Sequence, residues 1–227
     1  MGTYGQFCPV AVGSEILTER WTPVLLREFL AGSRRFNELR RGVPLMSPSL
    51  LSKRLKTLER QGIVERIPSA DGRGAEYRLT EAGVELAPVV EGIGRWALRW
   101  ARSESNAPER SDASLLFWDI RRGVAVDAAP ERRLVLHFRV QGSIDGKSRF
   151  WLVIDRGEVD LCMIDPGFEV DVTAELHVST LVDIWLGDRS FGDAMRQGDM
   201  TVDGPSSLVR LLPRLLPGSP MVASLRN

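Results

Sequence analysis

The sequence has few of the residues that build disulfide-rich proteins, metal proteins or nucleophilic enzymes. Its 227 residues include two cysteines, Cys8 and Cys162, and two histidines, His137 and His177. Two cysteines cannot form a disulfide framework, and neither belongs to a Cys-x-x-Cys pair or has a histidine partner at metal-ligand spacing. The histidines have no serine, cysteine or aspartate arranged around them as in a nucleophile motif. We therefore expect a protein of a reducing compartment that is not an enzyme and has no metal and no cofactor.

Long apolar runs are also absent. No stretch approaches the roughly 20 apolar residues that a membrane-spanning helix needs. The N-terminus does not combine a basic segment with a following apolar run, as a signal peptide would. With 43% hydrophobic and 26% charged residues, the composition is that of a globular protein long enough for one large domain or two small ones. The expected location is the cytoplasm, with no membrane partner.

Charge is divided unevenly along the chain, although its formal total is zero. The first 103 residues contain 16 basic and 11 acidic residues, and the remaining 124 contain 14 basic and 19 acidic residues. The two parts therefore carry net charges of +5 and −5. This asymmetry favours two domains, a basic one that meets a polyanion and an acidic one with another task.

The sequence of residues 47–62 predicts a helix and contains residues that favour both its start and its end. Ser47 can cap the first turn, Pro48 suits the first helical position, and Gly62 can adopt the left-handed conformation that ends a helix. Leucines at positions 51, 55 and 58 fall on one face, and hydroxyls and cations occupy the other. A solvated surface helix usually mixes acids with its bases, so we interpret this one as a DNA-recognition helix. Its expected DNA contacts are Ser47, Ser49, Ser52, Lys53 and Lys56, with base reading expected at Ser49, Ser52 and Lys53.

The preceding segments complete a helix-turn-helix. The spacing of apolar residues predicts helices over residues 9–17 and 21–32, followed by a short basic helix over 34–41 that Ser33 caps. Arg34 and Arg35 are expected to contact DNA phosphates, as Arg40 and Arg41 could. The alternative is that these arginines form only a solvated helix face.

A β-hairpin and a long helix follow the predicted recognition helix. Residues 63–67 and 75–79 alternate as strands do, which predicts a wing with Arg73 at its tip, placed to reach a minor groove. The alternative is a surface hairpin that merely contains an arginine. Thr80 should cap an amphipathic helix that extends to about residue 102 and is bent near Pro88 or the glycines at 92 and 94. We expect its apolar face, with tryptophans at 96 and 100, to form a dimer seam.

Several segments, taken in order, resemble the HxlR branch of the MarR-like winged-helix regulators. They are residues 8–10, 19–22, 25–30, 34–40, 47–55, 58–66 and 76–83. The resemblance implies a cytoplasmic bacterial or archaeal homodimer that binds palindromic double-stranded operator DNA, with its DNA-binding domain over residues 1–102. In some members of that family a cysteine near the position of Cys8 senses oxidants or electrophiles, so Cys8 is a candidate redox sensor. The alternative for Cys8 is a small packed residue at the start of a helix.

The second half has a different pattern. Residues 103–113 are polar and contain a proline, which predicts a linker. Strands are expected over residues 133–140, 149–155, 158–164, 170–178 and 200–202, with helices over 114–123, 179–186 and 190–197 and a last one from 206. A meander followed by helices predicts an α+β domain over residues 114–227. The chain is therefore expected to be a multidomain protein with a mainly-α winged helix-turn-helix domain and an α+β domain.

The α+β half resembles the sterol-carrier-protein type 2 family, most clearly over residues 171–178, 186–200 and 202–204. The resemblance implies a curved sheet covered by helices around an apolar tunnel for fatty acyl, sterol or similar ligands. The candidate lining residues are Trp118, Phe138, Trp151, Met163, Trp185, Phe191 and Met195. The alternative is that these side chains are core, and that the half is a filled-in module that dimerises or recruits a partner. The predicted function is a homodimeric transcriptional regulator whose C-terminal domain binds an apolar small molecule, an effector that biases the dimer between DNA-competent and incompetent states. We prefer this prediction to a lipid carrier or enzyme with a vestigial helix-turn-helix.

Overall fold

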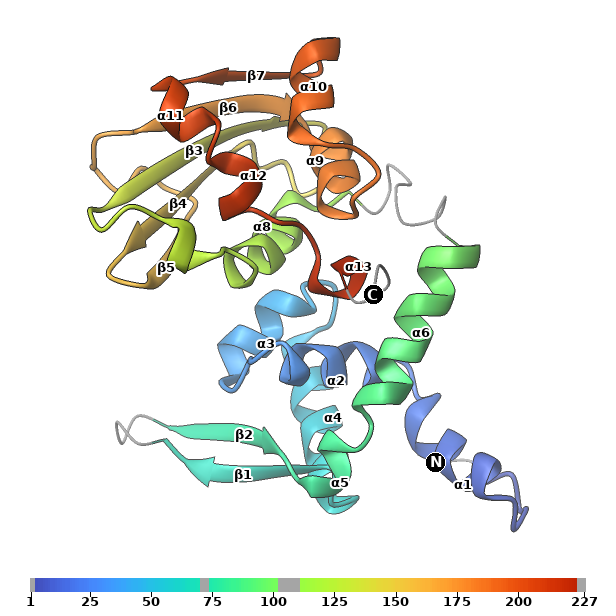
Figure 1. Ribbon diagram of the computed structural model, residues 1–227. Helices are drawn as coiled ribbons and strands as arrows, with labels where there is room; N and C mark the ends of the chain where they lie inside the picture. Colours follow the sequence, from blue (N-terminus) through green and yellow to red (C-terminus); the bar gives the residue numbers. More distant parts are fainter. Residues whose placement is uncertain (1–2, 70–73, 102–110, 224–227) are drawn as a thin grey trace. The chain divides into compact units, whose positions relative to one another are not determined.

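The computed structural model describes residues 3–69, 74–101 and 111–223 (Figure 1). The chain divides into two compact units, an N-terminal unit of residues 1–94 and a C-terminal unit of residues 95–227. The expected linker over residues 103–113 lies mostly outside the described residues, because the description resumes at residue 111. Within the described ranges, no helix is both long enough and apolar enough to cross a bilayer.

The N-terminal unit is a helix-turn-helix followed by a β-hairpin (Figure 1). Its elements are α1 (Pro9–Leu17), α2 (Thr22–Leu30), α3 (Phe36–Gly42), α4 (Pro48–Arg60), β1 (Val64–Pro68), β2 (Ala75–Leu79), α5 (Glu81–Val84) and the first turns of α6 (Ala87–Trp100). The core forms where α2, α3 and α4 meet, and the leucines at 25, 26, 39, 51, 55 and 58 are all completely buried. The predicted apolar face of the recognition helix is therefore confirmed.

Both predicted ends of α4 are confirmed. The Ser47 Oγ accepts a hydrogen bond from the Leu50 N–H at 3.3 Å, and Pro48 is the first helical residue. At the other end, the Gly62 N–H donates to the Glu59 carbonyl at 3.0 Å, and the Ile63 N–H donates to the Leu58 carbonyl at 3.0 Å. With Gly62 at a φ of 70°, these bonds form a Schellman motif.

The prediction that Ser33 caps α3 is wrong. The residue at the N-cap position is Arg35, and the Ser33 hydroxyl donates instead to the buried Glu28 carboxylate at 3.0 Å. The Glu38 carboxylate accepts from the backbone N–H groups of Arg34 and Arg35, at 2.7 and 3.0 Å. Glu38, the third residue of the helix, thus accepts hydrogen bonds at the start of α3, where the sequence pattern predicted that Ser33 would do so.

The helix expected over residues 80–102 is divided in two. Thr80 caps α5 as predicted, since the Gly83 N–H donates to its Oγ1 at 3.2 Å. The helix then breaks between Val84 and Ala87, ahead of Pro88. In a continuous helix the Pro88 ring would clash with the carbonyl of Val84, so the chain ends one helix and starts another.

The C-terminal unit is an α+β region with a five-stranded sheet. Its elements are α8 (Ala113–Arg122), a 3-10 turn (Val126–Ala128), β3 (Leu134–Gln141), β4 (Arg149–Asp155), β5 (Glu158–Cys162), β6 (Val172–His177), α9 (Val178–Trp185), α10 (Phe191–Gln197), β7 (Met200–Asp203), α11 (Ser206–Val209), α12 (Leu212–Leu215) and α13 (Pro220–Ala223). The strand order is β5-β4-β3-β6-β7, and only the β3–β6 pair among these neighbours is parallel. The expected α+β class is therefore confirmed.

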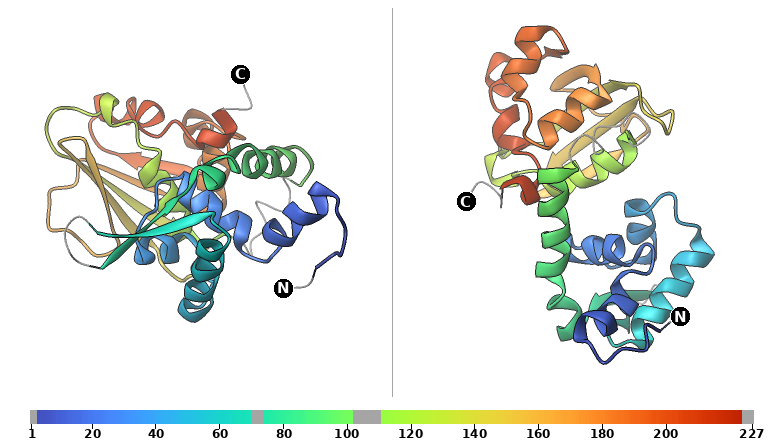
Figure 2. Two further views of the ribbon diagram at one scale, coloured as in Figure 1. Left: turned by 90° about the horizontal axis from the view of Figure 1, so that it is seen from below. Right: turned by 90° about the vertical axis from the view of Figure 1, so that its right-hand side faces the viewer.

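Helices cover one face of this sheet (Figure 1 and Figure 2). The side chains that alternate along β3, Leu134, Leu136, Phe138 and Val140, pack with residues of α8, α9, α10 and α12 in one hydrophobic cluster. The opposite face has a smaller cluster that contains Val135, Trp151 and Val153. The sheet is thus apolar on both faces at its centre, which explains the unbroken hydrophobic runs over residues 134–136 of β3 and 150–154 of β4.

Candidate nucleic-acid interface

The outward face of α4 carries one continuous stripe of polar and basic side chains. Ser49, Lys53, Lys56 and Arg60 follow one another at spacings of four, three and four residues, and all four are exposed. At 3.6 residues per turn, this spacing places them opposite the buried leucines. Arg60 was not among the predicted contacts, although the same helical spacing identifies it.

The other predicted side chains of α4 lie beside this stripe. The Ser47 hydroxyl is exposed but is engaged in the cap, and it lies 3.2 Å from the Ser49 hydroxyl. Ser52 is half-buried on one flank of the helix. Small hydroxyls at the N-terminal end of a helix let a duplex approach closely, where the positive end of the helix dipole also favours phosphate.

Lys53 and Lys56 form no ion pair with any residue that the structure describes. Arg34 differs, because its guanidinium donates to the carbonyls of Phe29 and Ser33 at 2.6 and 3.0 Å. It thus binds the C-terminal end of α2, where free carbonyls attract a cation. The two lysines therefore have no ion-pair partner within the described residues, whereas Arg34 uses some of its N–H donors inside the fold.

Arg35 links α3 to the wing. Its side chain is about half exposed (48%), donates to the Ser69 Oγ at 3.2 Å and lies 3.8 Å from the Glu76 carboxylate. The backbone adds to this connection, because residue 35 forms a β-bridge with Glu76 and the Tyr77 N–H donates to the Arg34 carbonyl at 2.7 Å. The hairpin is therefore held against the start of α3. Arg73 falls in residues 70–73, outside the described residues.

Arg54 faces inward, although it belongs to the same helix as the exposed lysines. Its side chain is 9% exposed and lies 2.5 Å from the Glu19 carboxylate. The hydrogen bond from Arg54 lowers the pKa of Glu19 below its ordinary value. This pair holds α4 to the segment before α2. The sequence could have indicated this burial, because Arg54 follows Leu51 by three residues and so lies on the same side of the helix as the buried leucines.

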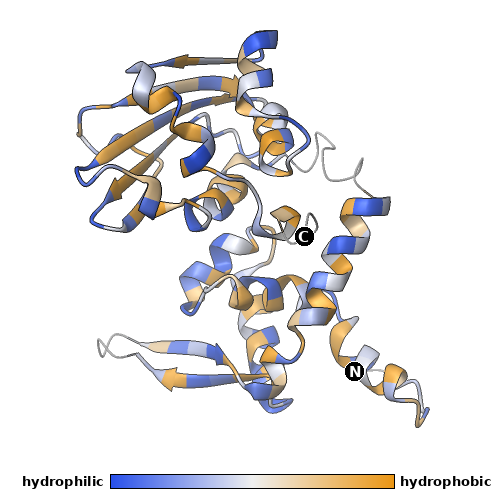
Figure 3. Cartoon of the chain, viewed as in Figure 1, coloured by the Kyte–Doolittle hydropathy of each residue, from blue (hydrophilic) through white to orange (hydrophobic). Residues whose placement is uncertain are grey.

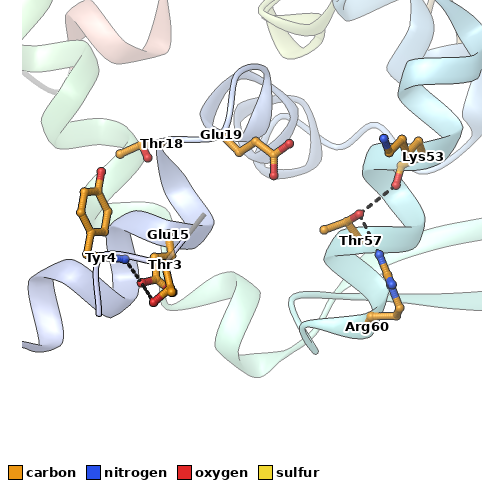
Figure 4. A pocket seen from close by; sticks show the side chains of 8 residues that line it. All are labelled: Thr3, Tyr4, Glu15, Thr18, Glu19, Lys53, Thr57 and Arg60. Atoms are coloured by element: carbon orange, nitrogen blue, oxygen red, sulfur yellow. Dashed lines mark hydrogen bonds between the residues drawn. The ribbon is translucent and has the colours of Figure 1, made fainter. Parts of the chain in front are cut away.

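A hollow of about 710 Å³ lies beside the stripe, between α4 and the N-terminal segment with α1 (Figure 4). Polar and charged side chains line it: Thr3, Tyr4, Glu15, Thr18, Glu19, Lys53, Thr57 and Arg60. Lys53 therefore belongs both to the outward stripe and to this hollow.

The seven apolar candidates of the C-terminal unit do not share one environment. Phe138 and Phe191 lie in the main core, with Trp185 and Met195 packed against it. Trp151 lies on the opposite face of the sheet, where its ring stacks on His137 with centroids 4.5 Å apart. Trp118 lies under the Arg121 guanidinium at 4.8 Å, and Met163 is 38% exposed.

Cys8 occupies the N-cap position of α1 and is half-buried, and its side chain caps no backbone N–H. No cluster of three or more His, Cys, Asp or Glu side chains that could hold a metal ion occurs in the ranges that the structure describes.

Comparison with known proteins relates this chain to regulators. The model of the HxlR-like helix-turn-helix family matches residues 16–105. The uncharacterized HTH-type transcriptional regulator YvaP of Bacillus subtilis (strain 168) is 42% identical over 88 residues, which are 38% of this chain and 81% of YvaP. The uncharacterized HTH-type transcriptional regulator Rv3095 of Mycobacterium tuberculosis (strain H37Rv) is 42% identical over 83 residues, 36% of this chain and 52% of Rv3095. This chain thus spans about half the length of that mycobacterial relative. The structure of the reduced form of the transcriptional regulator YodB from B. subtilis has 31% sequence identity and a TM-score of 0.37, over 42% of this chain and 95% of YodB.

Proposed function

Because this chain belongs to the HxlR-like helix-turn-helix family and is a transcriptional regulator with a DNA-binding domain, we propose that it acts as a cytoplasmic homodimer on double-stranded operator DNA. In this proposal α4 enters the major groove, and the twofold axis of the dimer sets two α4 helices about 34–36 Å apart.

The observation that carries the proposal is the stripe of Ser49, Lys53, Lys56 and Arg60 on α4, beside which the only acidic residue of the helix, Glu59, lies near the C-terminal end. Ser49, Ser52 and Lys53 lie near the N-terminal end of the helix, where side chains reach base edges. Lys56 and Arg60 lie farther along and suit phosphate contacts. Arg34, Arg35 and Arg73 stay in the proposal as contacts from α3 and the wing, with Arg34 and Arg35 also bound within the fold.

The dimer seam proposed for α6 rests on its exposed apolar residues. Val89, Ile93, Trp96 and Trp100 recur at spacings of four, three and four residues and are 44%, 49%, 62% and 67% exposed. Figure 3 shows hydrophobic and hydrophilic segments alternating along α6, as expected for an amphipathic helix. A contiguous apolar stripe on a helix favours association, and a second copy of the same helix offers a matching surface.

The salt dependence of DNA binding tests the phosphate contacts. Each lysine that neutralises a phosphate adds roughly 0.9 to the slope of log affinity against log salt concentration. We expect Lys56→Gln to reduce this slope by about that amount, measured by fluorescence anisotropy on a duplex selected from a random-sequence library. Lys147→Gln, which removes the same charge from the C-terminal unit, is the control and should leave the slope unchanged. An affinity independent of salt would contradict the proposal.

For the C-terminal unit we propose a sterol-carrier-like domain whose interior is filled, so that it dimerises or recruits a partner. The Phe117 ring lies 4.3 Å from the Phe150 ring and 5.1 Å from the Phe138 ring, centroid to centroid, and all three side chains are at most 1% exposed. Aromatic packing between the helices and the sheet favours this version over a tunnel for an apolar effector. Native mass spectrometry of gently purified protein distinguishes the two, since a co-purifying lipid would support the effector.

Cys8 stays a proposed redox sensor because it is half-buried at the start of a helix rather than sealed in a core. Treatment with diamide followed by measurement of DNA affinity tests this role. An unchanged affinity contradicts it.

A further inference from the structure

The hollow beside α4 has a size suited to a small molecule. Its volume of about 710 Å³ lies within the roughly 300–1,000 Å³ that is usual for small-molecule sites. Every one of its eight lining side chains is polar or charged, Tyr4 adding a ring as well as a hydroxyl, so its occupant must be polar.

The hollow has two walls of opposite charge, and Figure 4 shows them facing each other. Glu15 and Glu19 belong to the wall formed by α1 and the segment that follows it. Lys53 and Arg60 belong to the wall formed by α4. The ion pair between Glu19 and Arg54 of α4 joins the two walls at 2.5 Å. Among the residues that the structure describes, Glu15, Lys53 and Arg60 take part in no ion pair, so their charges face the hollow without direct partners of opposite charge.

The acidic side chains of the hollow have hydrogen-bond or ion-pair partners nearby, whereas its basic side chains have no counter-ion among the described residues. The Glu15 carboxylate accepts from the Thr3 hydroxyl at 2.8 Å and from the Tyr4 N–H at 2.7 Å, and Glu19 pairs with Arg54. The Arg60 guanidinium donates to the Thr57 hydroxyl and the Lys56 carbonyl, both neutral, and Lys53 has no ion pair within the described part of the chain. Arg54 lowers the pKa of Glu19 and balances its charge, so the charges left for an external partner are the carboxylate of Glu15 on one wall and the cations of Lys53 and Arg60 on the other.

A molecule with one charge suits only one of these walls. A simple anion would bind Lys53 and Arg60 but would meet repulsion from Glu15, and a simple cation would meet the reverse. A molecule with an ammonium group at one end and a carboxylate at the other satisfies both walls with charge-assisted hydrogen bonds. We propose that this hollow binds a small zwitterion of the amino-acid class, and that its occupancy weakens DNA binding.

The coupling to DNA follows from Lys53, and this step rests on the proposed function. The same ammonium group lines the hollow and belongs to the outward stripe of α4. A bound carboxylate would engage it and would place a negative charge beside the DNA backbone. By thermodynamic linkage, DNA must weaken the binding of the zwitterion by the same factor by which the zwitterion weakens the binding of DNA.

Calorimetry on the full chain without DNA tests the site directly. The probe is 6-aminohexanoate, with hexanoate and hexylamine as matched analogues that each lack one charge. We expect the zwitterion to bind at least about tenfold more tightly than either analogue, since each loses one charge-assisted contact. Equal binding of hexanoate, or no binding of 6-aminohexanoate, would overturn the inference.

Three substitutions locate the bound molecule. Lys53→Gln and Glu15→Gln should each weaken 6-aminohexanoate by about tenfold, and glutamine at position 15 keeps an oxygen for Thr3 and Tyr4. Lys56→Gln is the control, because Lys56 belongs to the same stripe but does not line this hollow. It should lower DNA affinity and leave zwitterion binding unchanged.

The outcomes separate the two proposals. If Lys56→Gln weakens DNA binding and the zwitterion fails to bind, the hollow is not a site and the DNA-binding face stands. If the zwitterion binds as expected and no lysine variant changes the DNA affinity or its salt slope, the DNA-binding face is wrong and the site stands. If the zwitterion binds but leaves the DNA affinity unchanged, the coupling is overturned.

Discussion

At the residue scale, position on a helix decides what a cation does. Lys53 and Arg54 are neighbours in the sequence, yet Lys53 is exposed on the outward stripe and Arg54 is buried against Glu19. One residue along a helix is a rotation of about 100°, enough to move a side chain from the solvent face to the core. A count of basic residues therefore overstates the proposed DNA-binding surface, and the helical spacing shows which cations are exposed.

A buried carboxylate explains another local feature. Glu28 is completely buried, lies 2.5 Å from the Arg27 guanidinium and accepts from Ser33. A Cβ built on Gly42 would lie 1.9 Å from the Glu28 carboxyl carbon, so a larger residue at that position would force the buried Glu28 side chain to shift. Gly42 is the last residue of α3, and its lack of a side chain serves the contact between α2 and α3.

His137 makes the stability of the C-terminal unit depend on pH. Its side chain is 8% exposed, and its Nε2 has no hydrogen-bond partner among the described residues. Burial lowers the pKa of His137, and the nearby Arg139 and Arg149 act in the same direction, against Asp165 and Glu175. An unfolded histidine has a pKa of about 6.5. The buried neutral ring therefore stabilises the fold above that pH, and this contribution is lost as the pH falls toward the lowered value.

The variant His137→Phe tests this dependence, because phenylalanine keeps an aromatic ring against Trp151 and cannot titrate. We expect the melting temperature of the wild-type protein to fall more between about pH 7 and pH 5.5 than that of the variant, as followed by circular dichroism. Parallel losses in the two proteins would show that other groups cause the acid sensitivity.

At the element scale, α4 is defined by its ends. Ser47 caps its first turn, and the Schellman motif at Gly62 ends its last turn. The helix therefore ends just before strand β1 of the wing begins. The break between α5 and α6 follows from Pro88 in the same local way. These boundaries need no tertiary contact to be specified.

Substitution by alanine should change the free energy of unfolding in opposite directions at two glycines that have open space around them. Gly62 has a φ of 70°, whereas Gly92 lies inside α6, and in the described structure no atom lies within 4 Å of a Cβ built on either. We expect Gly62→Ala to reduce the free energy of unfolding by about 1–2 kcal/mol, because a left-handed conformation disfavours a side chain. Gly92→Ala should raise it by about 0.5–1 kcal/mol, because alanine favours a helix interior. Urea denaturation measures both, and a shift of the same sign would contradict the assignment of Gly62 as the C-terminal cap.

At the scale of the whole molecule, the chain combines a basic unit and an acidic unit with separate cores. The N-terminal cluster contains residues of α2, α3 and α4, and the main C-terminal cluster contains residues of the five-stranded sheet and its helices. No residue belongs to both of these clusters. Each unit thus buries its own apolar surface, as independent domains do.

The proposed dimer gives a prediction at this scale. Trp96→Glu would place a charge in the apolar seam, where it has no partner and loses its hydration. We expect light scattering after gel filtration to give twice the chain mass for the wild-type protein and a single chain mass for the variant. Arg95→Glu, on the other side of α6, is the control and should remain dimeric. A wild-type monomer, or a dimeric Trp96→Glu variant, would contradict the seam.

The sequence by itself determined those features that depend on residues within a turn or two of one another. The bounds of α1, the caps of α4 and α5, the apolar face of α4 and the α+β pattern of the second half all follow from spacing and capping chemistry. The basic stripe was visible for the same reason, apart from Arg60 at its far end.

Only the tertiary structure decided how distant residues pair. It placed Arg54 on Glu19, gave the Ser33 hydroxyl to Glu28, and set α1 opposite α4 so that acids and bases face each other across a hollow. It also distributed the seven apolar candidates among a core, an opposite sheet face and the surface. Such pairings depend on which faces of separate elements meet, and a periodic pattern within one element carries no information about its partner.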